Sequence, residues 1–174
     1  MLDVSIAYNR YKFLGHEFLT WLWFIMDEDQ ARILKAQSDM LSLEMDNRIV
    51  LENSLDNRIE KITIKGDDAG LEEAKLSLQK GGVVTELNFS LKTGEHEWKF
   101  NIKGESLNIS SLKSPETGKI EKKEDVEGAV LEKIYLYEKV VSLVENLYKQ
   151  FIQIRISNKW NSETVPRIKK WIKS

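Results

Sequence analysis

The sequence predicts an α+β fold, an antiparallel sheet with helices packed on one face, including one long C-terminal helix. Residues 85–91 and 96–102 alternate apolar and polar side chains on either side of a Thr-Gly pair, which is typical of a hairpin with one covered face. Residues 125–157 repeat apolar side chains at steps of four and three, the period of an amphipathic helix. Because the chain has 174 residues, we expect a single domain over residues 1–174.

The other helices are expected over residues 14–27, 30–37, 69–80 and 167–172. The first of these is apolar almost all round, which predicts burial on more than one side. Trp21 and Trp23 lie two residues apart within it and therefore point to different sides of the helix. Their apolar surroundings favour core packing over exposed base stacking. Pro166 is a suitable residue to open the last helix, since its missing N–H costs nothing there.

Strands are expected over residues 41–45, 49–51, 58–65, 85–91, 96–102 and 107–109, where the apolar period is two. Asp46-Asn47 separates the first two segments and predicts a tight turn, because both residues tolerate positive φ. Residues 114–123 are polar and contain Pro115 and Gly118, which predicts a loop.

Composition excludes several classes of function. The chain has no Cys, so disulfides, thiolate metal sites and Cys nucleophiles are excluded, and the reduced cytoplasm is the expected compartment. A net charge of −2 excludes a globally basic protein held on nucleic acid by bulk charge. The most apolar run, residues 18–26, is shorter than the roughly 20 residues that a bilayer requires. Residues 1–10 do not open with a basic region. We expect neither a membrane partner nor a signal peptide.

Residues suited to catalysis or metal binding show no complete pattern. His16 and His96 are each followed by Glu, but neither belongs to an H-E-x-x-H motif. We therefore expect no enzyme, no catalytic residue, no metal and no cofactor. A metal-dependent nuclease is the weakest of three hypotheses, because converging carboxylates are required and acidic residues also suit helix caps and turns. Its candidate ligands are Asp27, Asp29, Asp67 and Asp68.

Charge is distributed unevenly along the chain. Residues 146–174 carry a net charge of +6, with Glu163 as the only acid, whereas residues 1–145 carry −8. The candidate DNA-binding residues in this basic segment are Lys149, Arg155, Lys159, Arg167, Lys169, Lys170 and Lys173. A basic end on an acidic body can face phosphate while the whole chain stays near neutral. The alternative is a solvated helix whose cations suit its dipole.

Residues 13–23, FLGHEFLTWLW, resemble a signature of RdgC-like proteins, the recombination-associated family. The similarity continues through residues 47–52, 97–100, 110–113, 131–136 and 168–172. This resemblance implies a non-enzymatic protein that binds double-stranded DNA without reading its sequence. In that family, two subunits form a ring with a basic inner surface that surrounds the duplex and limits access of the RecA recombinase. The resemblance therefore implies DNA as a partner and a homodimer, and it carries over no catalytic residue.

Two hypotheses of different classes follow. In the first, the basic residues listed above contact backbone phosphates and release counterions, which predicts weak, sequence-tolerant and salt-dependent DNA binding. In the second, the chain is a homo-oligomeric interaction module without nucleic-acid binding. The apolar first helix and the long helix over residues 125–157 favour this second hypothesis, because together they exceed what one sheet can cover.

Overall fold

The computed structural model describes residues 4–34, 42–55, 58–66, 68–118, 122–123 and 125–174. Within these residues it contains a five-stranded antiparallel sheet in the order β2-β1-β3-β4-β5. The strands are β1 (Ser42–Leu55), β2 (Arg58–Lys65), β3 (Val83–Thr93), β4 (His96–Lys103) and β5 (Asn108–Lys113). The helices are α1 (Val4–Glu28), α2 (Gln30–Leu34), α3 (Asp68–Gln79), α4 (Asp125–Arg155), η1 (Trp160–Thr164) and α5 (Val165–Ile172).

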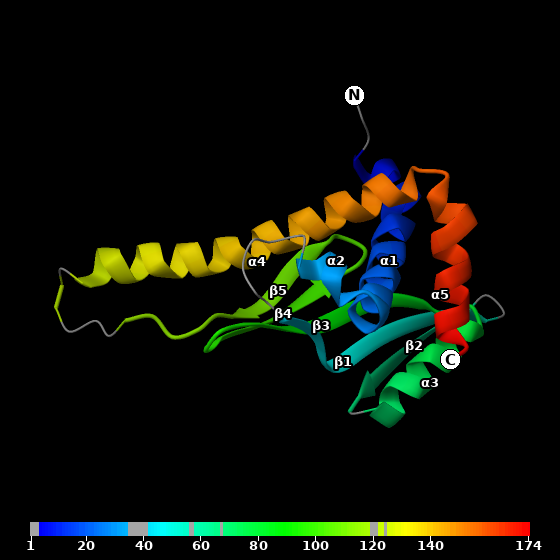
Figure 1. Ribbon diagram of the computed structural model, residues 1–174, viewed down its shortest axis with the longest axis horizontal. Helices are drawn as coiled ribbons and strands as arrows, with labels where there is room; N and C mark the ends of the chain where they lie inside the picture. The colour runs from blue at the N-terminus through cyan, green and yellow to red at the C-terminus, as the bar shows by residue number, and fades with distance from the viewer. Residues whose placement is uncertain (1–3, 35–41, 56–57, 67, 119–121, 124) are drawn as a thin grey trace.

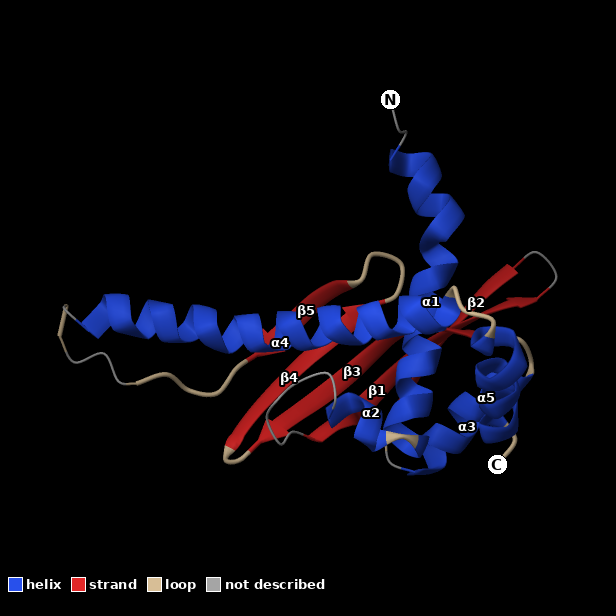
Figure 2. Ribbon diagram, turned by 45° about the horizontal axis from the view of Figure 1, so that its top comes forward, coloured by secondary structure: helices blue, strands red, loops and turns tan. Residues whose placement is uncertain are grey.

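Helices α1 and α4 cross one face of the sheet (Figures 1 and 2). This arrangement confirms the predicted α+β fold with a long C-terminal helix. The predicted hairpin is confirmed as β3 and β4, whose alternating apolar residues form the centre of the covered face. Phe89 lies opposite Phe100 and Leu91 opposite Trp98, and all four side chains are buried. Gly94 occupies the connecting turn with a φ of 57°, a conformation that glycine adopts without strain.

The tight turn predicted at Asp46-Asn47 is wrong. β1 runs through this pair as one strand, and its register against β3 shifts between Met45 and Ile49. A β-bulge explains the shift, since extra residues on one strand bend it without ending the pairing. Residues 45 and 49 remain in register with core positions of β3, so the bulge keeps the apolar side chains of β1 on the covered face.

Helix α1 begins ten residues earlier than the predicted start at residue 14. Residues 18–26 of α1 include Trp21 and Trp23, both fully buried, which confirms the expected core packing. The helix approaches the sheet closely because Gly15 lies directly against Gly104 in the turn between β4 and β5. A Cβ atom on Gly15 would collide with the carbonyl oxygen of Gly104. Two glycines in contact therefore set the distance between α1 and this turn.

Helix α4 confirms the predicted long helix and ends at Arg155, two residues before the predicted end. Its middle part packs on the sheet, where Trp98 Nε1 donates a hydrogen bond of 3.0 Å to the carbonyl oxygen of Leu136. Its N-terminal part extends beyond the sheet (Figure 1). Several apolar side chains there are solvent-exposed, among them Val130 and Leu131 at 51% and 60%.

The C-terminal segment contains an element that the sequence pattern does not predict. A π-helical segment, η1, leads directly into α5, and Pro166 lies in the first turn of α5 as expected. Trp160 of η1 packs edge-on against Phe151, and Trp171 of α5 packs edge-on against Trp23 with ring centroids 4.9 Å apart. These contacts fix the C-terminal segment against α4 and α1. Residues 35–37 and 41 of the predicted elements lie outside the described residues.

Replacing Gly15 with Ala tests the close approach of α1 to the β4–β5 turn. Overpacking typically costs about 1–3 kcal/mol, and this exceeds the gain of about 1 kcal/mol that Ala brings to a helix. We expect Gly15→Ala to lower the free energy of unfolding in urea. Gly128→Ala is the matched control, because no atom lies within 4 Å of its added Cβ. It should be neutral or stabilising, and equal effects of the two substitutions would contradict the proposed contact.

Candidate nucleic-acid interface

Five of the seven predicted cations lie in the C-terminal segment, residues 159–173. These residues, named here the α5 cations, are Lys159, Arg167, Lys169, Lys170 and Lys173. All five are exposed. Among the residues that the structure describes, no carboxylate lies within 4.0 Å of their charged nitrogens. The guanidinium of Arg167 lies 5.3 Å from the centre of the Phe24 ring, but none of the five charges is neutralised by an acidic residue within the described part of the chain.

The remaining two cations have acidic partners. Arg155 is an internal contact, since its Nε donates to Glu17 Oε2 on α1 at 2.6 Å and its guanidinium lies 5.2 Å from the centre of the Trp160 ring. This ion pair joins α4, α1 and η1. Lys149 lies 3.9 Å from Glu145, one turn earlier on α4, in an exposed pair that contributes little to stability. Arg155 therefore has a structural role that the sequence pattern did not indicate.

Helix α5 holds its cations on a firmly attached element. Ile168 and Trp171 are buried, so the exposed cations occupy the remaining sides of the helix. Trp171 Nε1 donates a hydrogen bond of 3.0 Å to Asp27 Oδ2 on α1, and Gln79 of α3 donates to the carbonyl oxygen of Ile172 at 2.8 Å. Two other helices therefore fix the orientation of α5.

Asp27 lies at the centre of this attachment. Burial raises the pKa of its carboxyl group above the usual value of 3.8. The hydrogen bond from Trp171 and the charge of Lys75, whose Nζ lies 3.9 Å away, lower the pKa and offset only part of this effect. The environment of Asp27 thus favours the protonated form more than water does.

The acidic residues considered for a metal do not form a cluster in the described part of the chain. Asp27 accepts a hydrogen bond from Trp171, and Asp29 forms an ion pair of 3.2 Å with Arg32. Asp67 and the side chain of Asp68 lie outside the described residues. Within the rest, no three His, Cys, Asp or Glu side chains gather in an arrangement that could hold a metal ion. The two histidines lie on different elements, His16 on α1 and His96 at the start of β4.

A groove between α1 and the C-terminal segment was not predicted from the sequence. It has a volume of about 380 Å³ and is lined mostly by apolar side chains, with Lys169 among its residues. Its walls come from residues more than 140 positions apart, such as His16 and Trp160. No local pattern indicates such a site, because it is created only when α5 packs beside α1.

No protein-family model matches the chain, and no curated protein is similar to it at a significant level. The resemblance to RdgC-like proteins therefore stays a prediction. None of the helices in the described residues combines the length and the apolarity that crossing a membrane requires.

The pH dependence of stability tests the environment of Asp27. The folded state holds this proton more tightly than the unfolded state does. The contribution of this proton to the free energy of unfolding is therefore fully present at low pH, and it is lost as pH rises through the raised pKa of Asp27. Asp27→Asn removes the titration and retains an oxygen that accepts from Trp171. We expect the variant to be at least as stable as the wild type at pH 7, and this advantage to shrink as pH falls toward 4 in thermal unfolding. A variant less stable at pH 7 but equal at pH 4 would contradict this interpretation.

Proposed function

We propose that the protein binds the phosphate backbone of double-stranded DNA, without reading its sequence, through the α5 cations. The observation that carries the proposal is that these five exposed cations share one anchored helical segment and have no carboxylate partner among the described residues. Charges that are already satisfied within the fold would contribute little to phosphate binding. Arg155 is such a case, so we assign it a structural role instead.

The dimensions of α5 suit a backbone contact. Its eight residues carry three of the five cations and extend about 12 Å at 1.5 Å per residue. Over this length duplex DNA presents about seven charges, at one per about 1.7 Å of its axis. Four of the five cations are lysines, which act as compact point charges on phosphate and lack the rigid fork with which Arg reads guanine. These properties support electrostatic, sequence-tolerant binding.

The acidic remainder of the chain limits this binding. Residues 1–145 carry a net charge of −8, which repels DNA at distances beyond the local field of α5. Salt screens both the repulsion by the acidic residues and the attraction to the cations. Because phosphate contacts release counterions, the binding affinity also falls steeply as the salt concentration rises. We therefore expect measurable affinity only at low ionic strength.

Charge reversal at Lys169 and Lys170 tests the proposal. We expect K169E/K170E to weaken binding to a fluorescent 25-base-pair duplex by at least about tenfold at low salt, because two phosphate contacts become repulsive. Fluorescence anisotropy measures the affinity, and light scattering and thermal unfolding verify that the variant is folded.

The matched control is K122E/K123E, which reverses two adjacent exposed lysines and changes the net charge equally. Lys122 and Lys123 directly precede α4, and this end of α4 lies far from α5 (Figure 1). The control should retain most of the affinity. Equal losses in both variants would show that bulk charge, and not the α5 cations, governs binding.

A second candidate function, self-association, is favoured by the exposed part of α4. Val130, Ile134, Tyr137 and Val141 follow steps of four, three and four, the spacing of a coiled-coil seam. Each of these side chains is 38–51% exposed. We name them the α4 seam. A different stripe of the same helix, which includes Leu136 and Val140, packs into the core, so the seam is left for another partner.

Charges beside the α4 seam suit a second copy in parallel orientation. Lys133 and Glu138 flank the seam on opposite sides and lie five residues apart. In a parallel pair of helices, this spacing brings the lysine of one copy to the glutamate of the other. In an antiparallel pair, the lysine would face the lysine of the other copy and the glutamate would face the glutamate, so opposite charges would no longer meet.

A single cysteine tests parallel pairing, and the chain has no native Cys to interfere. In a parallel dimer Ile134 faces its own counterpart, so we expect I134C to form an intermolecular disulfide under mild oxidation. Glu132 lies on the opposite side of α4, and E132C is the matched control that should remain unlinked. Non-reducing electrophoresis and light scattering report the outcome. A monomeric protein at high concentration, or equal cross-linking of both variants, would contradict the proposed seam contact.

A further inference from the structure

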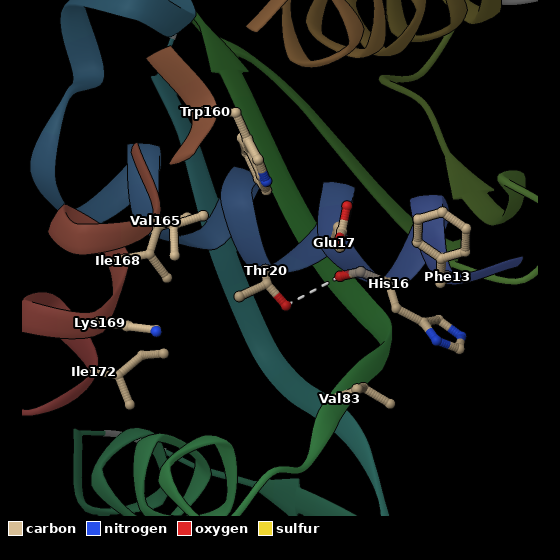
Figure 3. Close-up of a pocket in the computed structure, with 10 residues that line it drawn as sticks. All are labelled: Phe13, His16, Glu17, Thr20, Val83, Trp160, Val165, Ile168, Lys169 and Ile172. Carbon is tan, nitrogen blue, oxygen red and sulfur yellow. Dashed lines mark hydrogen bonds between the residues drawn. The ribbon is translucent and has the colours of Figure 1, made fainter. Parts of the chain in front are cut away.

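The groove between α1 and the C-terminal segment has an apolar floor and an open rim (Figure 3). Trp160 and Ile168 form part of the floor and are only 6% and 8% exposed. Phe13 and Val83 lie at the rim and are 43% and 39% exposed. The volume of about 380 Å³ is at the small end of the range for ligand sites, about 300–1,000 Å³. The groove therefore suits a small molecule with an apolar body.

The polar groups of the groove give it a local positive charge. Glu17 is engaged by Arg155, and the Thr20 hydroxyl donates a hydrogen bond of 3.0 Å to the carbonyl oxygen of His16. Lys169 extends from α5 toward Thr20 across the groove (Figure 3). Within the described residues, no carboxylate lies within 4.0 Å of its ammonium group. A single unneutralised cation beside apolar walls selects for a ligand with one negative charge.

We infer that this groove binds a small amphipathic monocarboxylate, such as a medium-chain fatty acid. The carboxylate accepts a hydrogen bond from Lys169, and the hydrocarbon chain covers Trp160 and Ile168. Burial of the chain removes apolar surface from water on both molecules, and the charged contact fixes the orientation. A doubly charged phosphate ester is less suitable, because the apolar walls cannot replace its hydration. This ligand site goes beyond the proposed DNA binding and does not depend on it.

Octanoate is a suitable probe, and the five tryptophan indoles of the chain provide an internal readout in heteronuclear NMR spectra. Trp160→Phe identifies the indole signal of Trp160. We expect octanoate, below its micellar concentration, to shift this signal in a saturable manner. Affinity should rise by about fourfold for each methylene added from hexanoate onward until the groove is filled.

The variants Lys169→Gln and Lys170→Gln show whether octanoate binding depends on the groove or on the general positive charge of α5. Both remove one exposed cation from α5, but only Lys169 lines the groove. We expect Lys169→Gln to weaken octanoate binding by about threefold, the effect of a partly exposed ion pair, and Lys170→Gln to leave it unchanged. Octylamine and 1-octanol should bind more weakly than octanoate to the wild-type protein.

Three results would overturn the inference. The first is the absence of a saturable shift at Trp160 with any of the carboxylates. The second is equal binding of octanol and octanoate, which would indicate a purely apolar surface such as a contact for a partner side chain. The third is an equal loss of octanoate affinity in Lys169→Gln and Lys170→Gln. Failure of the DNA proposal is recognised separately, because DNA binding is proposed to depend on both lysines, whereas octanoate binding is proposed to depend on Lys169 and not on Lys170.

Discussion

The burial of α1 between the sheet and the C-terminal half of the chain is the constraint on which the rest of the structure depends. One side of α1 meets the sheet, where Gly15 allows the backbones of the helix and the β4–β5 turn to touch. On its other sides, Phe18 packs against Phe151 of α4, and Trp23 against Trp171 of α5. Because a single helix contacts all three elements, displacement of α1 would move both the long helix and the basic segment.

This arrangement divides the basic C-terminal segment into internal and external charges. Arg155 lies where α4, α1 and η1 meet, and its charge is paired with Glu17. The cations that follow are exposed along residues 159–173, a segment fixed by buried Trp160, Ile168 and Trp171. The electric field around the segment therefore comes from its unpaired cations and not from Arg155. These cations are held by a segment that packs firmly on α1 and α4. The same packing of α5 beside α1 creates the apolar groove, so the two proposed sites share α5 and have Lys169 in common.

Patterns over a few neighbouring residues predicted most of the fold. The hairpin, the long helix and the buried first helix each depend on a repeat that the local sequence displays. The turn expected at Asp46-Asn47 was wrong. Residues that tolerate irregular backbone occur in both turns and bulges, and only the pairing with β3 shows that this pair lies in a bulge. The Arg155–Glu17 pair and the wall that Trp160 gives to the groove were not predictable, because each joins segments far apart in the chain. For the candidate interface, the sequence indicated which cations gather, and packing decided which of them remain exposed.

The salt dependence of duplex binding by the unaltered protein tests the central claim most directly. If the five α5 cations contact backbone phosphates, a plot of log affinity against log salt concentration has a slope of about −4.5, since each neutralised phosphate contributes about −0.9. This slope should be the same for duplexes of unrelated sequence. A slope between 0 and about −1, or no binding at low salt, would contradict the assignment of this surface to DNA.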